Sequence, residues 1–137
     1  MEKHQHFILH KPWGTISQFV NPAKRKKKLL GELYNFPNRT MAIGRLDVTS
    51  EGLLLLTTDG KVSEEIRSNK FEKEYYVQVD GLITEDVIKQ LQHGVTISVY
   101  GKPYTTKLCE VNMIDDLDNY PFESRHVRDE RHGPTSW

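Results

Sequence analysis

The sequence has a single cysteine and no long apolar run. Cys109 has no partner for an internal disulfide, and a lone thiol is typical of proteins from a reducing compartment. The opening segment MEKHQHFILHKP has no apolar run of the length that a signal peptide needs. No stretch approaches the roughly 20 apolar residues of a membrane span. We therefore expect a cytoplasmic protein with no membrane partner.

Several common catalytic signatures are also missing. There is no phosphate-cradling glycine-rich loop, no His-Glu-x-x-His zinc pair and no Gly-x-Ser-x-Gly elbow. Nucleotide-binding and hydrolase functions therefore lose their main support. His4, His6 and His10 share one face of an extended strand, a spacing that suits a metal ion, but no cysteine lies near them. We expect neither a metal nor a cofactor.

The charge of the chain is zero in total but unevenly distributed. Residues 1–47 contain nine Lys and Arg against three Asp and Glu, whereas residues 48–137 contain ten against sixteen. The basic excess is centred on the five consecutive cations of AKRKKK, which we call the basic run (Lys24–Lys28). Such a run is either a solvated loop or a contact with a phosphate backbone, which needs positive charge without fixed geometry.

Strand and helix patterns alternate along the chain, and the 137 residues suffice for one core, so we expect one domain over residues 1–137. The expected strands are residues 6–10, 15–20, 52–58, 73–81, 95–100 and 104–114. The expected helices are residues 28–36, 61–69 and 84–93, and residues 115–134 are expected to form a long polar loop. This order predicts an α+β fold with a mixed, largely antiparallel sheet.

Two of these segments carry sharper local signals. KEYYVQVDG alternates with period two, which places Tyr75 and Val77 on one face of a strand and Tyr76 on the other. In TEDVIKQLQHG, Thr84 is a candidate helix N-cap and Gly94 is the expected stop.

The segment GRLDVTSEGLLLLTTDG sets Arg45 and Asp47 directly ahead of a buried strand. Taken alone, such an Asp is typical of a turn residue whose carboxylate accepts backbone hydrogen bonds. The motifs KPWG (11–14) and KEYYVQVDG (73–81) flank it, and the three stand in the order and approximate spacing found in pseudouridine synthases. The chain resembles the branch of ribosomal small- and large-subunit enzymes that share a Gly-Arg-Leu-Asp motif. The late segment VRDERHGPTSW also resembles the large-subunit members.

The resemblance implies a catalytic domain that isomerises a uridine of ribosomal RNA, in the large subunit the 23S RNA, without a cofactor. Asp47 then takes the role of the nucleophile, and whether it attacks the base or the sugar stays open. Arg45 contacts phosphate or neighbouring bases once the uridine has left the stack, unless it simply pairs with Asp47. Tyr75 packs against the flipped uracil, unless it is an ordinary core aromatic.

The predicted RNA-binding residues are all cationic. They are the basic run, Lys24, Arg25, Lys26, Lys27 and Lys28, together with the motif lysines Lys11 and Lys73. An alternative from another class is a non-catalytic RNA-binding module that keeps the fold and these cations.

The family continues beyond a strand that begins with PTSW into an arginine-rich segment, whereas this sequence stops at Trp137. We therefore expect a catalytic domain that is incomplete at its C-terminus and that lacks the small N-terminal RNA-binding module of several relatives. A sheet edge left without its neighbour invites pairing with another chain. Self-association through that edge is the corresponding expectation.

Overall fold

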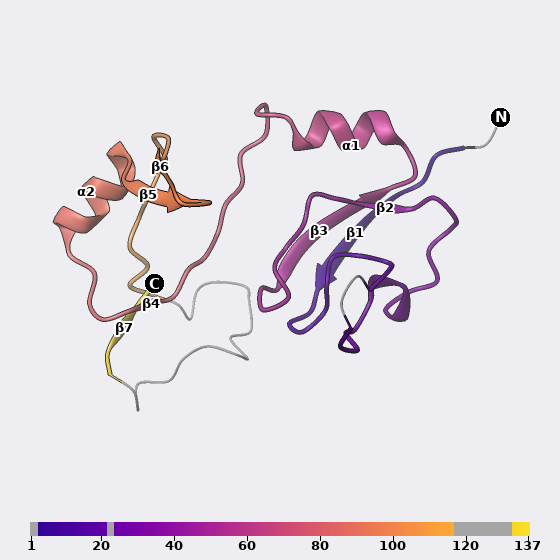
Figure 1. Cartoon of the computed structure of the whole chain (residues 1–137), viewed down its shortest axis with the longest axis horizontal. Helices are drawn as coiled ribbons and strands as arrows, with labels where there is room; N and C mark the ends of the chain where they lie inside the picture. Colours follow the sequence, from indigo (N-terminus) through magenta and orange to yellow (C-terminus); the bar gives the residue numbers. More distant parts are fainter. Residues whose placement is uncertain (1–2, 22–23, 117–132) are drawn as a thin grey trace. The chain divides into compact units, whose positions relative to one another are not determined.

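A computed structural model describes residues 3–21, 24–116 and 133–137. Contacts divide the chain into two units, Met1–Lys73 and Glu74–Trp137. The first unit contains a three-stranded sheet, and the second contains two separate two-stranded ladders (Figure 1). The expectation of one domain over residues 1–137 stays a prediction.

The sheet of the first unit has the strand order β1-β3-β2. β1 (His6–Lys11) and β2 (Met41–Ile43) both run antiparallel to the central strand β3 (Gly52–Thr57). Leu9 lies opposite Leu54. β3 has a strand on each side, and its alternate residues Leu54 and Leu56 face the core on one side of the sheet.

The core of the first unit lies on one face of this sheet. Leu30, Leu54 and Leu56 are buried, and partly buried apolar side chains pack around them. The ring of Phe36 meets that of Phe7 at 5.2 Å between centroids, nearly edge to face, a favourable arrangement for aromatic pairs. A 3₁₀ turn, Leu30–Glu32, carries Leu30 into this core.

On the chain beyond β3, Asp59 caps the helix α1 (Gly60–Arg67) by accepting a hydrogen bond from the Lys61 backbone N–H at 2.9 Å. α1 contacts β2 and β3. Ile8 and Leu53, which point away from the leucine core, are 81% and 65% exposed. The first unit thus buries one face of its sheet more completely than the other.

The predictions for residues 6–10, 52–58 and 61–69 are confirmed by β1, β3 and α1. Residues 15–20 do not form the predicted strand. Bends at Ser17, Phe19 and Val20 interrupt the segment, and its one bridge among the described residues is the parallel pairing of Thr15 with Lys28.

Two further differences from the prediction occur in the first unit. Of the predicted helix over residues 28–36, only Leu30–Glu32 is helical, as a 3₁₀ turn. The chain turns again at Tyr34–Phe36, where the Phe36 N–H donates to the Tyr34 carbonyl oxygen, so the helix does not continue. The strand β2 was not predicted, since three residues are too few to give a period.

The second unit contains short elements. They are β4 (Val79–Asp80), α2 (Glu85–His93), β5 (Thr96–Val99), β6 (Lys102–Thr105) and β7 (Thr135–Ser136). β4 pairs with β7 and β5 pairs with β6, both antiparallel. The Thr84 hydroxyl accepts the Val87 N–H at 3.4 Å, and Gly94, with φ of +101°, ends α2, so both predicted helix limits are confirmed.

The predicted strand over residues 73–81 is wrong in extent, since only Val79 and Asp80 are paired. A strand forms only where a neighbour takes up its hydrogen bonds, and β7 supplies two residues. The predicted strand 104–114 likewise ends at Thr105. Of the predicted loop 115–134, residues 117–132 lie outside the described part of the chain.

The described helices and antiparallel ladders agree with the α+β class. Among the described residues, no helix has both the length and the apolarity needed to cross a membrane.

Candidate active site

The chain that leaves β2 presents alternate side chains to solvent. Gly44 ends the strand with φ of +71°, a backbone conformation that other residues rarely adopt. Leu46 then packs against the leucine core, whereas its two neighbours, Arg45 and Asp47, are exposed. The inward Leu46 therefore fixes two oppositely charged side chains on the outside of the same short segment.

Two hydrogen bonds hold this segment from the other side. The Ser17 hydroxyl donates to the Leu46 carbonyl oxygen at 2.9 Å and accepts from the Leu46 N–H at 3.0 Å. The Gly14 N–H donates to the Val48 carbonyl oxygen at 2.7 Å. The turn of the KPWG motif and the chain around Asp47 are thus joined on both sides of Asp47.

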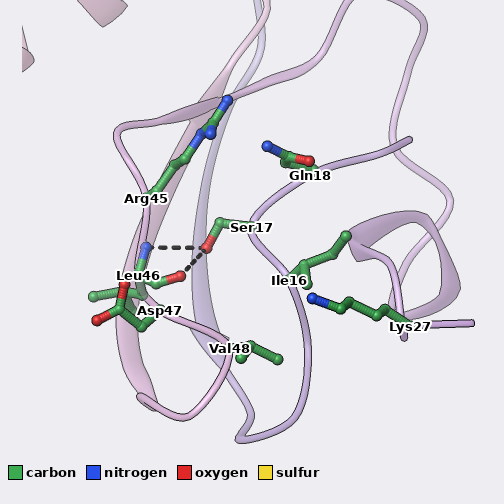
Figure 2. Close-up of a pocket in the computed structure, with 8 residues that line it drawn as sticks. All are labelled: Ile16, Ser17, Gln18, Lys27, Arg45, Leu46, Asp47 and Val48. Carbon is green, nitrogen blue, oxygen red and sulfur yellow. Dashed lines mark hydrogen bonds between the residues drawn. The ribbon is translucent and has the colours of Figure 1, made fainter. Parts of the chain in front are cut away.

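A pocket of about 270 Å³ lies between these two stretches of chain (Figure 2). Asp47 and Arg45 border it on one side. The remaining lining residues are Ile16, Ser17, Gln18, Lys27, Leu46 and Val48. The pocket therefore combines an apolar floor with one carboxylate and two cations.

Arg45 and Asp47 do not pair with each other. Figure 2 shows the guanidinium and the carboxylate pointing in different directions from the backbone, and no ion pair joins them in the part of the chain that the structure describes. The Asp47 backbone carbonyl accepts a hydrogen bond from the Ser50 N–H at 3.0 Å, so Asp47 does lie in a turn. Its carboxylate, however, accepts no hydrogen bond from the described residues. The structure therefore favours neither an ion pair between Arg45 and Asp47 nor a turn in which the Asp47 carboxylate accepts backbone hydrogen bonds.

Lys11 requires a correction, because we predicted it as an RNA contact. Its side chain is fully buried, and its Nζ donates to the carbonyl oxygens of Thr15 at 2.7 Å and Pro12 at 3.0 Å. Burial lowers the pKa of Lys11, while the carboxylates of Asp47 and Glu51 act in the opposite direction. Lys11 thus stabilises the turn behind the pocket and offers no surface to a phosphate.

The basic run lies on the surface and is connected to the pocket. All five residues, Lys24–Lys28, are exposed. The Ile16 N–H donates to the Lys28 carbonyl oxygen at 3.0 Å, and Lys27 is one of the pocket-lining residues. The run is therefore solvated, which is one of the two alternatives from the sequence, and near its end Lys27 lines the same pocket as Asp47.

Tyr75 and Lys73 lie in different units. Lys73 is the last residue of the first unit, and its Nζ donates to the Phe71 carbonyl oxygen at 3.0 Å while its side chain stays exposed. Tyr75 belongs to the second unit and is 67% exposed, which argues against an ordinary core aromatic. Its role at the site stays a prediction.

The histidines of the first strand bind threonine hydroxyls. His4 Nδ1 lies 3.2 Å from Thr58 Oγ1, and His6 Nδ1 lies 2.9 Å from Thr57 Oγ1. The described residues bring together no group of three side chains suited to a metal ion.

Ser17 and Gln18 are parts of the site that sequence reasoning missed. Ser17 is separated by 29 residues from the peptide that it holds. The sequence of a segment with the pattern of an ordinary strand does not indicate that one of its polar side chains bonds to a backbone so distant in the chain. Their proximity to the KPWG motif is the one sequence feature that could have drawn attention to Ser17 and Gln18.

Comparison with known proteins gives a consistent result. The RNA pseudouridylate synthase family matches residues 5–135. Ribosomal large subunit pseudouridine synthase E of Xanthomonas axonopodis pv. citri is 33% identical over 132 residues, covering 95% of this chain and 67% of the relative. Ribosomal large subunit pseudouridine synthase B of Bacillus subtilis is 35% identical over 98 residues, covering 70% and 40%. A crystal structure of a pseudouridylate synthase superposes with a TM-score of 0.63 at 26% identity, covering 85% of this chain and 49% of that one.

The chain belongs to the RNA pseudouridylate synthase family. The predicted family and the α+β fold are thereby confirmed. Type E large-subunit enzymes are among the similar proteins, including one from Vibrio vulnificus at 34% identity over 134 residues. The chain spans between 40% and 67% of the length of the large-subunit relatives named here.

Proposed function

We propose that this chain is the catalytic portion of an enzyme that isomerises a specific uridine of large-subunit ribosomal RNA, the 23S RNA, to pseudouridine. The observation that carries the proposal is the family match over residues 5–135, combined with an exposed, unpaired Asp47 carboxylate at the rim of a pocket. A ribosomal RNA substrate also implies that the protein acts in the cytoplasm.

The reaction breaks the bond between ribose C1′ and N1 of uracil, rotates the base, and forms a bond from C1′ to C5, after which the C5 proton is lost and N1 gains one. Every atom of the product comes from the substrate or from exchangeable protons. The protein must therefore supply a group that stabilises the separated sugar and base. A carboxylate is suited to this as a covalent catalyst. Asp47 is free to act, because its carboxylate is committed to no other described side chain or backbone group.

Arg45 and Tyr75 have supporting roles in this proposal. A stacked uridine hides its glycosidic bond, so the enzyme must move the base out of the helix and stabilise the opening. The exposed guanidinium of Arg45 suits contact with phosphate or with a neighbouring base. The exposed ring of Tyr75 suits stacking on the flipped uracil.

The basic run supplies sequence-independent affinity in this proposal. Its five cations, Lys24–Lys28, are exposed, and one of them, Lys27, lines the pocket, so the run suits the phosphate backbone near the target nucleotide. Lys73 is exposed and remains a candidate contact, whereas the buried Lys11 is withdrawn from the set.

The test is a turnover assay on 23S RNA fragments in which pseudouridine is detected by mass spectrometry. Asp47→Asn removes the nucleophile but keeps the size of the side chain. We expect the turnover rate to fall by several powers of ten, while RNA affinity and the fold stay unchanged. Turnover above about one per cent of wild type would remove Asp47 from the covalent role. Where the gene encodes residues beyond Trp137, the full product should be assayed beside the 137-residue chain.

A second candidate is an RNA-binding module without catalysis. The observation in its favour is the exposed basic run, which would bind RNA whether or not a reaction follows. RNA binding that depends on the basic run, with no pseudouridine formed by either the short chain or the full gene product, would favour this module over the enzyme.

We also propose that the 137-residue chain self-associates. The second unit exposes large apolar side chains, and its strands have pairing partners on one side only among the described residues. Open strand edges and apolar patches both favour pairing with a second copy.

A further inference from the structure

The guanidinium of Arg45 is held by a neutral partner. With the Gln18 amide oriented so that its oxygen faces Arg45, that oxygen lies 3.0 Å from each of the two terminal nitrogens of Arg45 and accepts two hydrogen bonds from one guanidinium. The amide nitrogen of Gln18 then donates to the Val20 carbonyl oxygen at 3.3 Å. Both ends of the amide are thus satisfied.

Only one orientation of the Gln18 amide gives this result. Figure 2 draws the reverse orientation, with the amide nitrogen toward Arg45. There the nitrogen faces only donors and the oxygen faces only acceptors. Because the orientation of an amide is assigned from its hydrogen-bond partners, the oxygen is placed toward the guanidinium.

The backbone that carries Gln18 is fixed independently of Arg45. The Gln18 carbonyl oxygen accepts the Leu30 N–H at 3.1 Å, and Leu30 is part of the buried core. The preceding Ser17 is bonded to both polar groups of the Leu46 peptide. Gln18 and Arg45 therefore extend from two stretches of chain whose separation is set by the frame around them.

The Gln18–Arg45 pair also lies where two hollows meet. A second pocket, of about 330 Å³, shares Ser17, Gln18 and Arg45 with the pocket beside Asp47. Its other lining residues are Phe19, Val20, Thr40, Met41, Ala42 and Gly44. The guanidinium at this border therefore faces both pockets.

A neutral acceptor has a different effect from a carboxylate. It orients the guanidinium through hydrogen bonds but leaves the full positive charge available to RNA. An acidic residue would orient it equally well but would cancel the charge. A side chain that is already ordered also loses less entropy when it engages the substrate.

We propose that Gln18 is a positioning residue. It holds the charged Arg45 guanidinium in an extended orientation, in which the guanidinium can bind the RNA at the position that the flipped base has vacated. The inference rests on the proposed function for its catalytic meaning. The pairing itself is a property of the free protein and is testable without RNA.

The experiment compares Gln18→Met, which keeps the side-chain length but has no amide oxygen, with Gln18→Glu, which keeps an acceptor but adds a negative charge. Gln90→Met is the matched control, because Gln90 is an exposed glutamine on α2, in the other unit. Circular dichroism and thermal unfolding establish that each variant is folded. The order of the Arg45 side chain is followed by ¹⁵N relaxation of its guanidinium in the free protein, and single-turnover rates and RNA affinity are measured alongside.

We expect Gln18→Met to loosen the Arg45 guanidinium and to lower the single-turnover rate by roughly tenfold, with a smaller effect on affinity, because orientation is lost but charge is kept. Gln18→Glu should keep Arg45 ordered but weaken RNA affinity and its salt dependence, because one positive charge is cancelled. Gln90→Met should match wild type throughout.

An Arg45 side chain equally ordered in wild type and Gln18→Met would overturn the inference. So would a loosened Arg45 in Gln18→Met with unchanged turnover, since Gln18 would then have no positioning role. If the wild-type chain and its full gene product both lack turnover, the proposed function fails. The relaxation data then decide the pairing alone, and RNA affinity of Gln18→Glu decides whether the charge of Arg45 faces RNA.

Discussion

The Ser17 hydroxyl hydrogen-bonds to both backbone polar groups of Leu46. It donates to the Leu46 carbonyl oxygen at 2.9 Å and accepts from the Leu46 N–H at 3.0 Å. Leu46 is the residue between Arg45 and Asp47. One side chain from the KPWG side of the pocket therefore holds the segment that carries both charged groups of the candidate site.

Replacing Ser17 with Ala should affect stability and turnover together. The change leaves two partly buried backbone groups without a partner, which costs about 1–3 kcal/mol of unfolding free energy. Ser63→Ala is the control, because Ser63 is also buried but lies on α1 and does not line the pocket. Urea unfolding and the turnover assay provide the measurements. Equal effects of the two substitutions would show that Ser17 has no special part in holding Leu46.

Neutralising Lys24, Arg25 and Lys26 to Gln should weaken binding to all RNAs alike. Phosphate contacts release counterions, so the loss of three such contacts flattens the slope of log affinity against log salt by roughly two to three. A matched triple substitution of exposed lysines in the second unit, Lys89, Lys102 and Lys107, should leave the slope nearly unchanged. If the slope is the same in wild type and in the basic-run variant, the run is only a solvated loop.

Lys11 should give the stability of the protein a dependence on alkaline pH. Burial holds its pKa below the ordinary value of 10.5, so the unfolded chain binds the proton more tightly than the folded one. Stability contributed by Lys11 is therefore lowest below its folded pKa and rises as the pH increases from there toward 10.5. A neutral amine still has two N–H groups for the two carbonyl oxygens that it serves.

The measurement is the unfolding free energy of wild type minus that of Lys11→Met, followed from neutral pH to about pH 10. The difference should grow with pH. Lys89→Met, at an exposed position on α2, controls for the loss of a surface lysine. A difference that stays constant or falls with pH would contradict the assigned environment of Lys11.

Thr15→Val should stabilise the protein. Thr15 is fully buried, and its hydroxyl has no hydrogen-bond partner among the described residues. Valine has nearly the same shape and removes the unsatisfied group, so we expect a gain of about 1 kcal/mol in unfolding free energy. Thr15→Ser keeps the hydroxyl and should bring no gain. A loss of stability in Thr15→Val would reveal a partner for this hydroxyl.

The 137-residue chain should associate in a concentration-dependent way. Leu82 and Leu108 of the second unit are 74% and 77% exposed, so replacing both with Ser should shift sedimentation velocity profiles toward the monomer. Ile8→Ser, in the first unit, tests the exposed sheet face separately. A single monomeric species for the unmodified chain across the micromolar range would rule out the association.

The elements that could be predicted from sequence are those with a local cause. Four leucines in a row, a capping Asp59 and a capping Thr84 act within a few residues, and β3, α1 and α2 appear where these signals place them. Arg45 and Asp47 were predicted as site residues from the Gly-Arg-Leu-Asp motif. The family comparison confirms the class of protein that this motif indicates.

The parts that could not be predicted depend on partners distant in the chain. The alternation of side chains in residues 73–81 produces a strand only where another strand lies alongside. β7 pairs with two residues of this segment, Val79 and Asp80. Lysine is expected at the surface, yet Lys11 is buried because two carbonyl oxygens receive its amine. The contact of Gln18 with Arg45 likewise exists only after the chain has folded.

The backbone bonds on either side of the basic run have a practical consequence for redesign. Ile16 bonds to Lys28, and Gln18 bonds to Leu30, so the excursion between Gln18 and Lys28 leaves and re-enters the fold at fixed points. Loops closed in this way tolerate changes in length and composition. Exchange should therefore be limited to Lys24, Arg25 and Lys26, because Phe19 packs against the core, Val20 holds the Gln18 amide and Lys27 lines the pocket. Under the proposed function, RNA affinity then becomes adjustable separately from the geometry around Asp47.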